Sequence, residues 1–406
     1  MDNKKRKRFP YLVLRTLFVI TICTSAFIAG YIARSPQQET NTAQAQTDTN
    51  KPFTLLQEVD RLVEDNFYKD VPSATTREYA AIRGYLDALE DPYSFFSDPP
   101  VTQNQSDSLA GRYGGIGVDV KRNEAGLIEL YPYPESPALA AGVLNGDILV
   151  AINDQMLNPT ERLDIIQQML RGEVTDEGNG VSITVEQPDG TNQHTIEIPF
   201  AEIRIPSVIW RVISGQPSFG YIQITSFTSR TPDELNDAMM GLADQNIAAL
   251  ILDLRDNSGG LLQESIQIAD AFLDGGTIVI EKSRKSGEKN EVATAGDIAA
   301  GLPIAIIVNG RTASASEVVA GALQQNRRGF VIGQRTRGKG SVQFIFGLSD
   351  GSSIRITAAI WLTPDGTPLD GIGLSPDIEM IPDENGRDVE LGEAVRQLSQ
   401  LLVTES

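Results

Sequence analysis

The sequence predicts a multidomain α/β protein. Residues 201–402 alternate apolar runs, among them Ala248–Leu254 and Pro303–Val308, with segments that carry apolar residues at helical spacing. This pattern is typical of a buried sheet covered by helices. Residues 113–200 instead contain several short strand-like stretches around one helical stretch. At 406 residues, the chain is long enough for two or three domains with cores of their own.

Composition excludes several kinds of site. The net charge is −20, which disfavours nucleic acid as a partner because phosphate binding needs clustered cations. One histidine, His194, and one cysteine, Cys23, argue against a structural zinc site, which needs about four such ligands. No phosphate-binding G-x-x-x-x-G-K-[ST] string occurs, so we expect neither a metal nor a cofactor. The same counts disfavour Ser-His-Asp and Cys-His nucleophiles, whereas a serine activated by a lysine remains open.

Residues 1–35 are predicted to be a cytoplasmic basic tail and a transmembrane anchor. A Lys/Arg cluster precedes the uncharged run Thr16–Ala33, whose 18 residues are at the lower limit for a membrane-spanning helix. The cluster places the N-terminus in the cytoplasm. We therefore expect a single-pass protein of the cell membrane, with residues 12–33 in the membrane and the body on the extracytoplasmic side. The alternative is a cleaved signal peptide, which would leave a secreted or periplasmic protein.

Residues 36–53 are polar and are predicted to form a flexible tether. Residues 54–112 are predicted to be an N-terminal helical region, because apolar residues recur at helical spacing from Leu55 to Phe67 and from Tyr79 to Leu89. Such faces indicate packing rather than chemistry. The stretch from Pro99 to Gly111 is polar, and we expect it to be mobile.

Residues 113–200 resemble a PDZ domain. The resemblance rests on the string Tyr113-Gly-Gly-Ile-Gly-Val118 and on the later run Gly142-Val-Leu-Asn-Gly-Asp-Ile-Leu-Val150. A helix is expected to start at Asn158-Pro-Thr-Glu161. The resemblance implies that backbone N–H groups of one loop hold the terminal carboxylate of a peptide, whose tail adds as a β-strand. That loop would consist of Gly115, Ile116, Gly117 and Val118. Alternatively, its glycines only make a tight turn.

Residues 201–402 are predicted to form one α/β domain. Strands are expected at Phe219–Ile224, Ala248–Leu254, Thr277–Ile280, Pro303–Val308, Gly329–Gly333 and Ser353–Leu362. Helices are expected after Thr231, Gly260 and Glu317, and a last one from Asp388 to Leu402. Ligands of such domains bind at the ends of the strands.

The stretch from Asn309 to Phe346 carries the candidate chemistry. It contains the serine-rich turn Thr312-Ala-Ser-Ala-Ser-Glu317 and, 25 residues after Ser314, the lysine of Gly338-Lys339-Gly340. These motifs resemble those of the carboxyl-terminal processing proteases, the tail-specific Ser-Lys peptidases. The resemblance implies a crotonase-like α/β core in which Ser314 is the nucleophile, Lys339 its base and Gln343 the residue that assists the lysine.

The glycine turn Asn257-Ser-Gly-Gly260 is the candidate oxyanion site. Such a turn before a helix presents backbone donors to an anion, as acyl transfer requires. The resemblance assigns this function to Gly259 or Gly260, together with the N–H of Ala315. Ser258 replaces the proline that is usual in the family. An ordinary helix cap would look the same in the sequence.

Each residue of the dyad also has another interpretation. Ser314 and Glu317 fit a capping box, and Ser316 is a rival nucleophile. A surface lysine is usually a solvated charge, whereas burial beside Val342 and Phe344 would lower the pKa of Lys339 toward the working range of a base.

These observations predict a membrane-anchored serine endopeptidase that cleaves proteins near their C-terminal tails, which the PDZ-like module would capture. Its partners would be proteins with exposed C-terminal tails. Whether it also forms a homo-oligomer or needs an activating adaptor is left open. One alternative is a catalytically silent scaffold that binds protein C-termini at the membrane. Another is a hydratase-like enzyme on a related core, for which Asp256 is a candidate acid or base.

Overall fold

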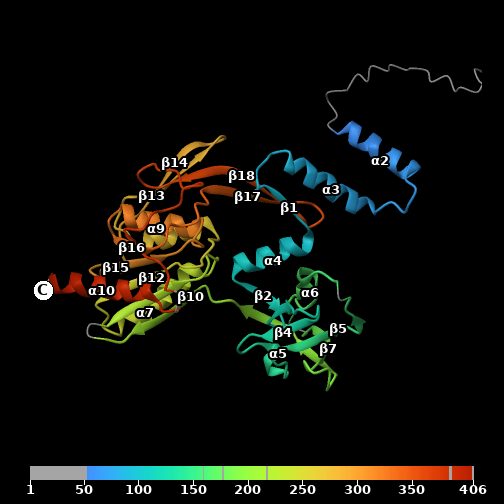
Figure 1. Ribbon diagram of the computed structural model, residues 1–406, viewed down its shortest axis with the longest axis horizontal. Helices are drawn as coiled ribbons and strands as arrows, with labels where there is room; N and C mark the ends of the chain where they lie inside the picture. The colour runs from blue at the N-terminus through green and yellow to red at the C-terminus, as the bar shows by residue number, and fades with distance from the viewer. Residues whose placement is uncertain (1–52, 159, 176–177, 216–217, 384–385, 405–406) are drawn as a thin grey trace, which may run out of the picture. The chain divides into compact units, whose positions relative to one another are not determined.

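Figure 1 shows the computed structural model of the chain, which describes residues 53–158, 160–175, 178–215, 218–383 and 386–404. The predicted basic tail, anchor and tether within residues 1–52 lie outside this range. Among the described residues, no helix has the length and apolar character needed to cross a membrane. The chain divides after Arg77 into two compact units, which are considered separately below.

Two lead-in helices are present, as predicted: α2 (Thr54–Asn66) and α3 (Ala74–Asp87), the second of which continues across the unit boundary. Within the first unit, Arg77 forms ion pairs with Asp60 and Glu64. The apolar face of α2 buries no residue and is exposed. The expected packing of this helix is therefore not seen within the described residues.

The segment expected to be mobile is in fact helix α4 (Pro99–Ala110). It begins with prolines at the first two positions, which suits a helix start, and ends at Gly111 in the left-handed region. Its partners are polar: the Gln168 amide donates to Asn104 Oδ1 at 2.8 Å, and Arg171 pairs with Asp107 at 2.6 Å. The helix was missed because polar contacts leave no apolar stripe in the sequence.

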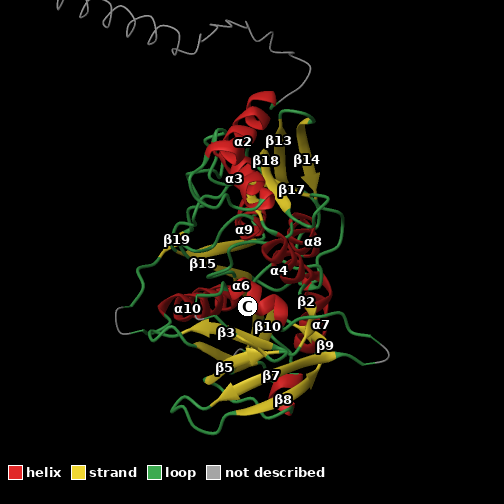
Figure 2. Ribbon diagram, turned by 90° about the vertical axis from the view of Figure 1, so that its right-hand side faces the viewer, coloured by secondary structure: helices red, strands yellow, loops and turns green. Residues whose placement is uncertain are grey.

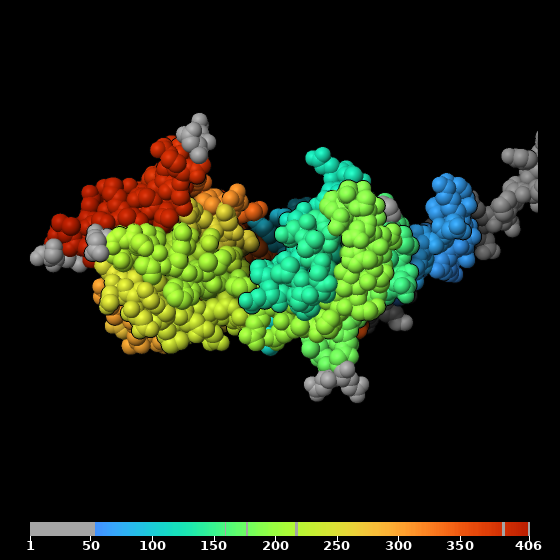
Figure 3. Space-filling model, turned by 90° about the horizontal axis from the view of Figure 1, so that it is seen from below, coloured from blue at the N-terminus to red at the C-terminus, as the bar shows by residue number. Residues whose placement is uncertain are grey.

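Residues 113–200 form a distinct β-rich lobe, seen in turquoise to green in Figure 3. Its sheet has the order β3-β4-β5-β7-β8, with β6 on β5, and the neighbours β5, β7 and β8 are visible side by side in Figure 2. The elements are β3 (Val118–Arg122), β4 (Ile128–Pro132), α5 (Pro137–Ala140), β5 (Asp147–Ile152), β6 (Gln155–Met156), α6 (Leu163–Met169), β7 (Gly180–Glu186) and β8 (His194–Pro199). Ile116, Leu130, Ile152, Ile166 and Ile183 lie in its core and are fully buried.

The helix of this lobe begins later than predicted. It starts at Leu163 rather than at Asn158. Asn158 Oδ1 instead accepts the N–H of Thr160 in a local turn, which precedes the helix. A two-stranded ribbon of β2 (Arg112–Gly115) and β9 (Ala201–Arg204) brings the two ends of the lobe together.

The C-terminal lobe is built on a six-stranded sheet of order β10-β11-β12-β15-β16-β19. All neighbouring pairs are parallel except β10 with β11. The strands are β10 (Val208–Ile213), β11 (Phe219–Ile224), β12 (Ala249–Asp253), β15 (Ile304–Val308), β16 (Gly329–Gly333) and β19 (Ile378–Glu379). The predicted apolar runs thus form the central strands, in which every residue of β12 and β15 is buried.

Helices cover both faces of this sheet, which explains the uninterrupted apolar runs. One face of the sheet forms a hydrophobic core with residues of three helices, α7 (Thr231–Ala243), α8 (Leu262–Ala271) and α9 (Ala315–Gln325). The other face forms a second core with residues of α10 (Val389–Thr404). All four helices start close to the predicted positions, because apolar spacing and turn residues both mark them.

A second, antiparallel sheet has the order β1-β18-β13-β14, and β17 also pairs with β18. Its strands are β1 (Phe95–Ser97), β13 (Thr277–Ser283), β14 (Gly287–Val292), β17 (Ser341–Gly347) and β18 (Ser353–Leu362). The register places Gln343 of β17 opposite Thr357 of β18, and Arg355 of β18 opposite both Phe95 and Ile345. Distant parts of the chain therefore meet along β18.

We predict that Leu252→Ala lowers the free energy of unfolding of the C-terminal lobe by about 2–5 kcal/mol, because it leaves a cavity at a fully buried position of β12. The change is measured by urea unfolding followed through tryptophan fluorescence, since Trp210 and Trp361 both lie in this lobe. Ile381→Ala, at a position that is 86% exposed, is the control and should change stability by less than about 0.5 kcal/mol. Equal effects of the two substitutions would contradict the assigned core.

Candidate active site

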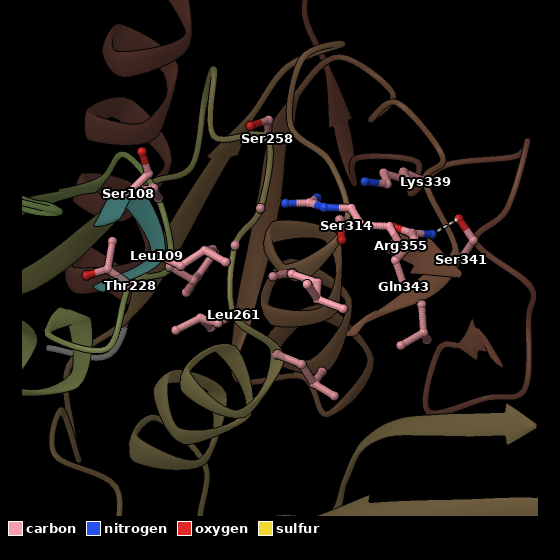
Figure 4. Close-up of a pocket in the computed structure, with 18 of the residues that line it drawn as sticks. Ser108, Leu109, Thr228, Ser258, Leu261, Ser314, Lys339, Ser341, Gln343 and Arg355 are labelled. Atoms are coloured by element: carbon pink, nitrogen blue, oxygen red, sulfur yellow. Dashed lines mark hydrogen bonds between the residues drawn. The ribbon is translucent and has the colours of Figure 1, made fainter. Parts of the chain in front are cut away.

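A cavity of about 410 Å³ in the C-terminal lobe brings together most of the residues singled out in the sequence (Figure 4). Its lining includes Ser314 and Lys339, the two residues of the predicted dyad. Gly259, Gly260, Ala315 and Gln343 also line it. Ser108 and Leu109 of α4 and Arg355 of β18 line it as well. Two cations and no carboxylate face this cavity, although the chain carries 54 acidic and 34 basic residues.

Ser314 lies where the chain leaves β15 and enters α9. Its backbone has φ 56° and ψ −121°, a sparsely populated conformation for a residue with a side chain, which costs on the order of 1–3 kcal/mol. Ser314 and Glu317 form the predicted capping box, in which the Glu317 carboxylate accepts the Ser314 N–H at 2.7 Å. The capping and site interpretations of Ser314 are therefore compatible, because the box fixes the turn while the side chain lines the cavity.

Gly259 lies directly against this turn. A Cβ at position 259 would lie 2.9 Å from Ser314 Cβ and 3.1 Å from the Ala313 carbonyl oxygen. The backbone there has φ +108°, which also favours glycine. Only a residue without a side chain allows the glycine turn to approach Ser314 this closely.

The rival residues lie elsewhere. Ser316 is fully buried, and its hydroxyl donates to the Asn257 carbonyl at 3.0 Å. This hydrogen bond joins the start of α9 to the glycine turn. Asp256 lines a different cavity, where it pairs with Arg311 at 2.6 Å. This ion pair holds the pKa of the Asp256 carboxyl below its usual range, which does not suit a general acid.

Lys339 reaches the cavity from a loop. The glycines on either side of the lysine are explained by the lack of space for a side chain. A Cβ at position 340 would lie 2.2 Å from the Asp370 backbone nitrogen, and one at position 338 would lie 2.7 Å from that of Gly373. The two glycines let the lysine loop press against residues 369–373. The close packing therefore requires the two glycines of the sequence motif, and the lysine lies between them in the loop.

The Lys339 ammonium has no ion-pair partner in the described part of the chain. Its Nζ lies 5.3 Å from the centre of the Tyr93 ring. Burial lowers the pKa of Lys339 below its ordinary value, and the positive charges of Arg355 and Arg337 lower it further. A lower pKa favours the neutral amine, which is the form that can accept a proton. The predicted dyad is open, because no hydrogen bond joins Lys339 to Ser314 among the described residues.

Gln343 lines the same cavity but does not hold the lysine. Its amide Nε2 donates to Ser341 Oγ at 2.8 Å (Figure 4). The expected hydrogen bond from Gln343 to Lys339 is therefore not formed here, although both side chains face one cavity.

The candidate oxyanion donors differ in their contacts. The N–H of Gly259 donates to Asn257 Oδ1 at 2.9 Å and is occupied. The N–H groups of Gly260 and Ala315 have no partner within the described residues, and both residues line the cavity. Two of the three candidates thus have an available donor.

The four residues of the predicted tail-binding loop are only partly brought together. Gly117 and Val118 line a narrow groove beside Gln167 and Leu170 at α6. Gly115 pairs with Ala201 of β9, and the fully buried Ile116 donates its N–H to the Leu170 carbonyl at 3.3 Å. The groove between β3 and α6 is therefore present, with Gly117 and Val118 at its edge.

Three residues of the site were missed in the sequence. Tyr93 lies under the lysine, Arg355 enters the cavity, and Glu317 was considered only as a cap. Glu317 is fully buried and accepts the N–H groups of Ser314, Gly338 and Lys339 and the hydroxyl of Thr336. Its place in the capping box was the available signal, whereas nothing near Arg355 in the chain marks that residue.

Comparison with known proteins agrees with these features. Residues 218–380 match the model of peptidase family S41, and residues 130–177 match that of the PDZ domain. A carboxy-terminal-processing protease of Bartonella bacilliformis is 34% identical over 336 residues, which cover 80% of this chain and 76% of that protein. The chloroplastic carboxyl-terminal-processing peptidase 2 of Arabidopsis thaliana is also 34% identical, over 76% of this chain and 62% of that protein.

Among solved structures, the photosystem II D1 C-terminal processing protease is similar, with 29% identity and a TM-score of 0.48 over 82% of this chain and 91% of that chain. The sequence identity to the Bartonella protein extends over most of both chains, and the family match covers strands β11 to β19, the serine turn and the lysine loop. The chain therefore belongs to the carboxyl-terminal-processing proteases of peptidase family S41, which are serine-type peptidases.

Proposed function

We propose that this protein hydrolyses peptide bonds near the C-terminal tails of proteins, with Ser314 as nucleophile and Lys339 as general base. The observation that carries the proposal is the cavity that Ser314 shares with Lys339, whose pKa is lowered and which has no counter-ion among the residues that the structure describes. A lysine is a base only when it is neutral, and burial without a carboxylate partner favours that form.

The reaction follows from these positions. Neutral Lys339 takes the proton of the Ser314 hydroxyl as the oxygen attacks the scissile carbonyl. The N–H groups of Gly260 and Ala315 would receive the developing oxyanion. Lys339 then returns the proton to the leaving amine. Neutral Lys339 next takes a proton from a water molecule that attacks the acyl group, and it passes this proton to the Ser314 oxygen as the acyl–oxygen bond breaks. Closure of the open dyad accompanies substrate binding, as is common for catalytic hydrogen bonds.

Gln343 would support the lysine after that closure. Its amide now donates to Ser341, and a rotation of the side chain would bring its oxygen toward the Lys339 ammonium. This assignment rests on the shared cavity and on the family motif.

The PDZ domain would bind the free carboxylate end of the substrate in the groove beside Gly117 and Val118. The basic residues before the apolar run Thr16–Ala33 support a membrane anchor with the body on the extracytoplasmic side. The substrates would then be proteins with exposed tails at or beyond that membrane. A homo-oligomer or an adaptor would act by closing the dyad.

We predict that Ser314→Ala and Lys339→Ala each lower kcat/KM by about 10³-fold or more, because each removes a group that forms or breaks a bond with the reacting atoms. The measurement is cleavage of an unfolded protein that ends in an apolar residue. Ser316→Ala is the matched control in the same turn, and it should leave a folded, active enzyme because its hydroxyl only bonds the Asn257 carbonyl. Loss of activity in Ser316→Ala alone would reverse the assignment.

The pH profile tests the base. Because Lys339 must be neutral, kcat/KM should rise with pH along a limb whose apparent pKa lies below 10.5, the ordinary value for lysine. Arg355→Gln removes a neighbouring positive charge and should move this limb to higher pH. Arg396→Gln removes an exposed arginine of α10 and should leave it in place. A limb that moves equally in both variants, or in neither, would speak against Lys339 as the titrating base.

Binding of the substrate's C-terminal carboxylate by the PDZ domain is tested by changing the end of the substrate. The same unfolded protein with an amidated C-terminus should be cleaved more slowly than the form with a free carboxylate, because the N–H groups of the groove lose their anionic partner. The difference should appear in KM rather than in kcat. Equal kcat/KM for the two forms would show that the PDZ domain does not read the terminal carboxylate.

A further inference from the structure

Arg355 is an unusual arginine for this chain. Other arginines with little exposure, such as Arg171, Arg255 and Arg328, pair with carboxylates at 2.6 Å. Arg355 is half-buried, yet no carboxylate pairs with it in the described part of the chain. Leaving water without an anionic partner is costly for a cation, and burial accordingly lowers the pKa of this guanidinium. Stability therefore does not explain why an arginine is half-buried at this position.

The side chain is held in place from two directions. One terminal nitrogen, Nη2, donates to the neutral Gln105 amide oxygen at 2.9 Å, and the guanidinium lies 5.5 Å from the centre of the Phe95 ring. The Nε atom is buried and has no hydrogen-bond partner. A fixed guanidinium with unused donors is a preorganised site for an anion, because its planar fork matches two carboxylate oxygens.

Arg355 faces the reacting groups. In Figure 4 its side chain extends from β18 into the cavity, and its guanidinium points the same way as the Lys339 side chain, toward the loop that carries Ser258. When Lys339 is neutral, as catalysis needs, Arg355 is the permanent positive charge among the residues that line this cavity. An anionic group of a bound peptide would thus find its partner beside the scissile bond.

We propose that Arg355 binds a carboxylate of the substrate next to the scissile bond, and so makes the protease selective for cleavage beside an anionic group. The carboxylate can come from an acidic side chain or from the free end of a short tail, and both present the same two oxygens. This inference rests on the proposed function of the cavity, and it adds a subsite distinct from the PDZ groove at Gly117 and Val118.

A different function for Arg355 would be electrostatic only, because its charge lowers the pKa of Lys339. The two functions have different signatures. A purely electrostatic effect shifts the pH profile for every substrate equally. Recognition of a carboxylate changes the ratio of kcat/KM between an acidic substrate and its amide counterpart, measured on the pH plateau of each variant.

The experiment uses the full chain and pairs of internally quenched peptides. In one arm, a single Asp or Asn is placed in turn at each of the positions around the cleaved bond. In the other, the peptide ends shortly after that bond with a free or an amidated terminus. The parent should favour the carboxylate member at one place by about 10-fold to 100-fold, the range of a hydrogen bond to a charged group.

Arg355→Gln should reduce this ratio to about one, Arg355→Lys should keep part of it, and Arg396→Gln should keep all of it. The arm in which the ratio appears identifies the source of the carboxylate. A ratio that survives in Arg355→Gln, or a parent that shows no preference at any position, would overturn the proposal. A parent that cleaves none of the peptides or unfolded proteins would instead count against the proposed function.

Binding measurements keep the test decisive if Arg355→Gln turns over too slowly. The same pairs, labelled with a fluorophore, are titrated with Ser314→Ala and with Ser314→Ala/Arg355→Gln, and the anisotropy gives the affinity ratio directly. Circular dichroism confirms that both proteins are folded. Equal carboxylate preference in the two proteins would also overturn the proposal.

Discussion

The site depends on the hydrogen bonds that the buried carboxylate of Glu317 accepts. It accepts the N–H of Ser314 at 2.7 Å, that of Gly338 at 2.7 Å and that of Lys339 at 2.9 Å, and the Thr336 hydroxyl as well. Burying a carboxylate is costly unless its oxygens are fully bonded, and here four donors satisfy them. One side chain thus joins the serine turn to the lysine loop, whose residues are far apart in the sequence.

The same network reaches Leu374, far beyond the lysine loop in the sequence. Thr336 accepts the N–H of Leu374 at 2.7 Å while donating to Glu317. The glycines at 338 and 340 allow residues 369–373 to approach the lysine loop closely. The serine turn, the lysine loop and residues 369–374 are therefore parts of one hydrogen-bonded assembly, and each constrains the others.

Much of this architecture could be predicted from the sequence because burial leaves a pattern. The uninterrupted apolar runs became β12 and β15, which are buried on both faces. The helix α4 and the strand β10 were missed, since α4 makes polar contacts and β10 exposes Ile209 and Trp210 at the sheet edge. That Ser314 and Lys339 belong to one site was predicted from motifs that resemble those of a known family. Arg355 was not, because its position depends on how β18 pairs with its neighbours.

The pairing along β18 has a consequence for how the enzyme comes into being. The Thr357 N–H donates to the Ser94 hydroxyl across 263 residues, and Arg355 contacts Gln105 across 250. Contacts of such long range form late, after the loop-closure entropy has been overcome. A growing chain that already contains Ser314 still lacks the strand and the arginine that complete the cavity. The lining of the cavity is therefore complete only once synthesis has passed β18.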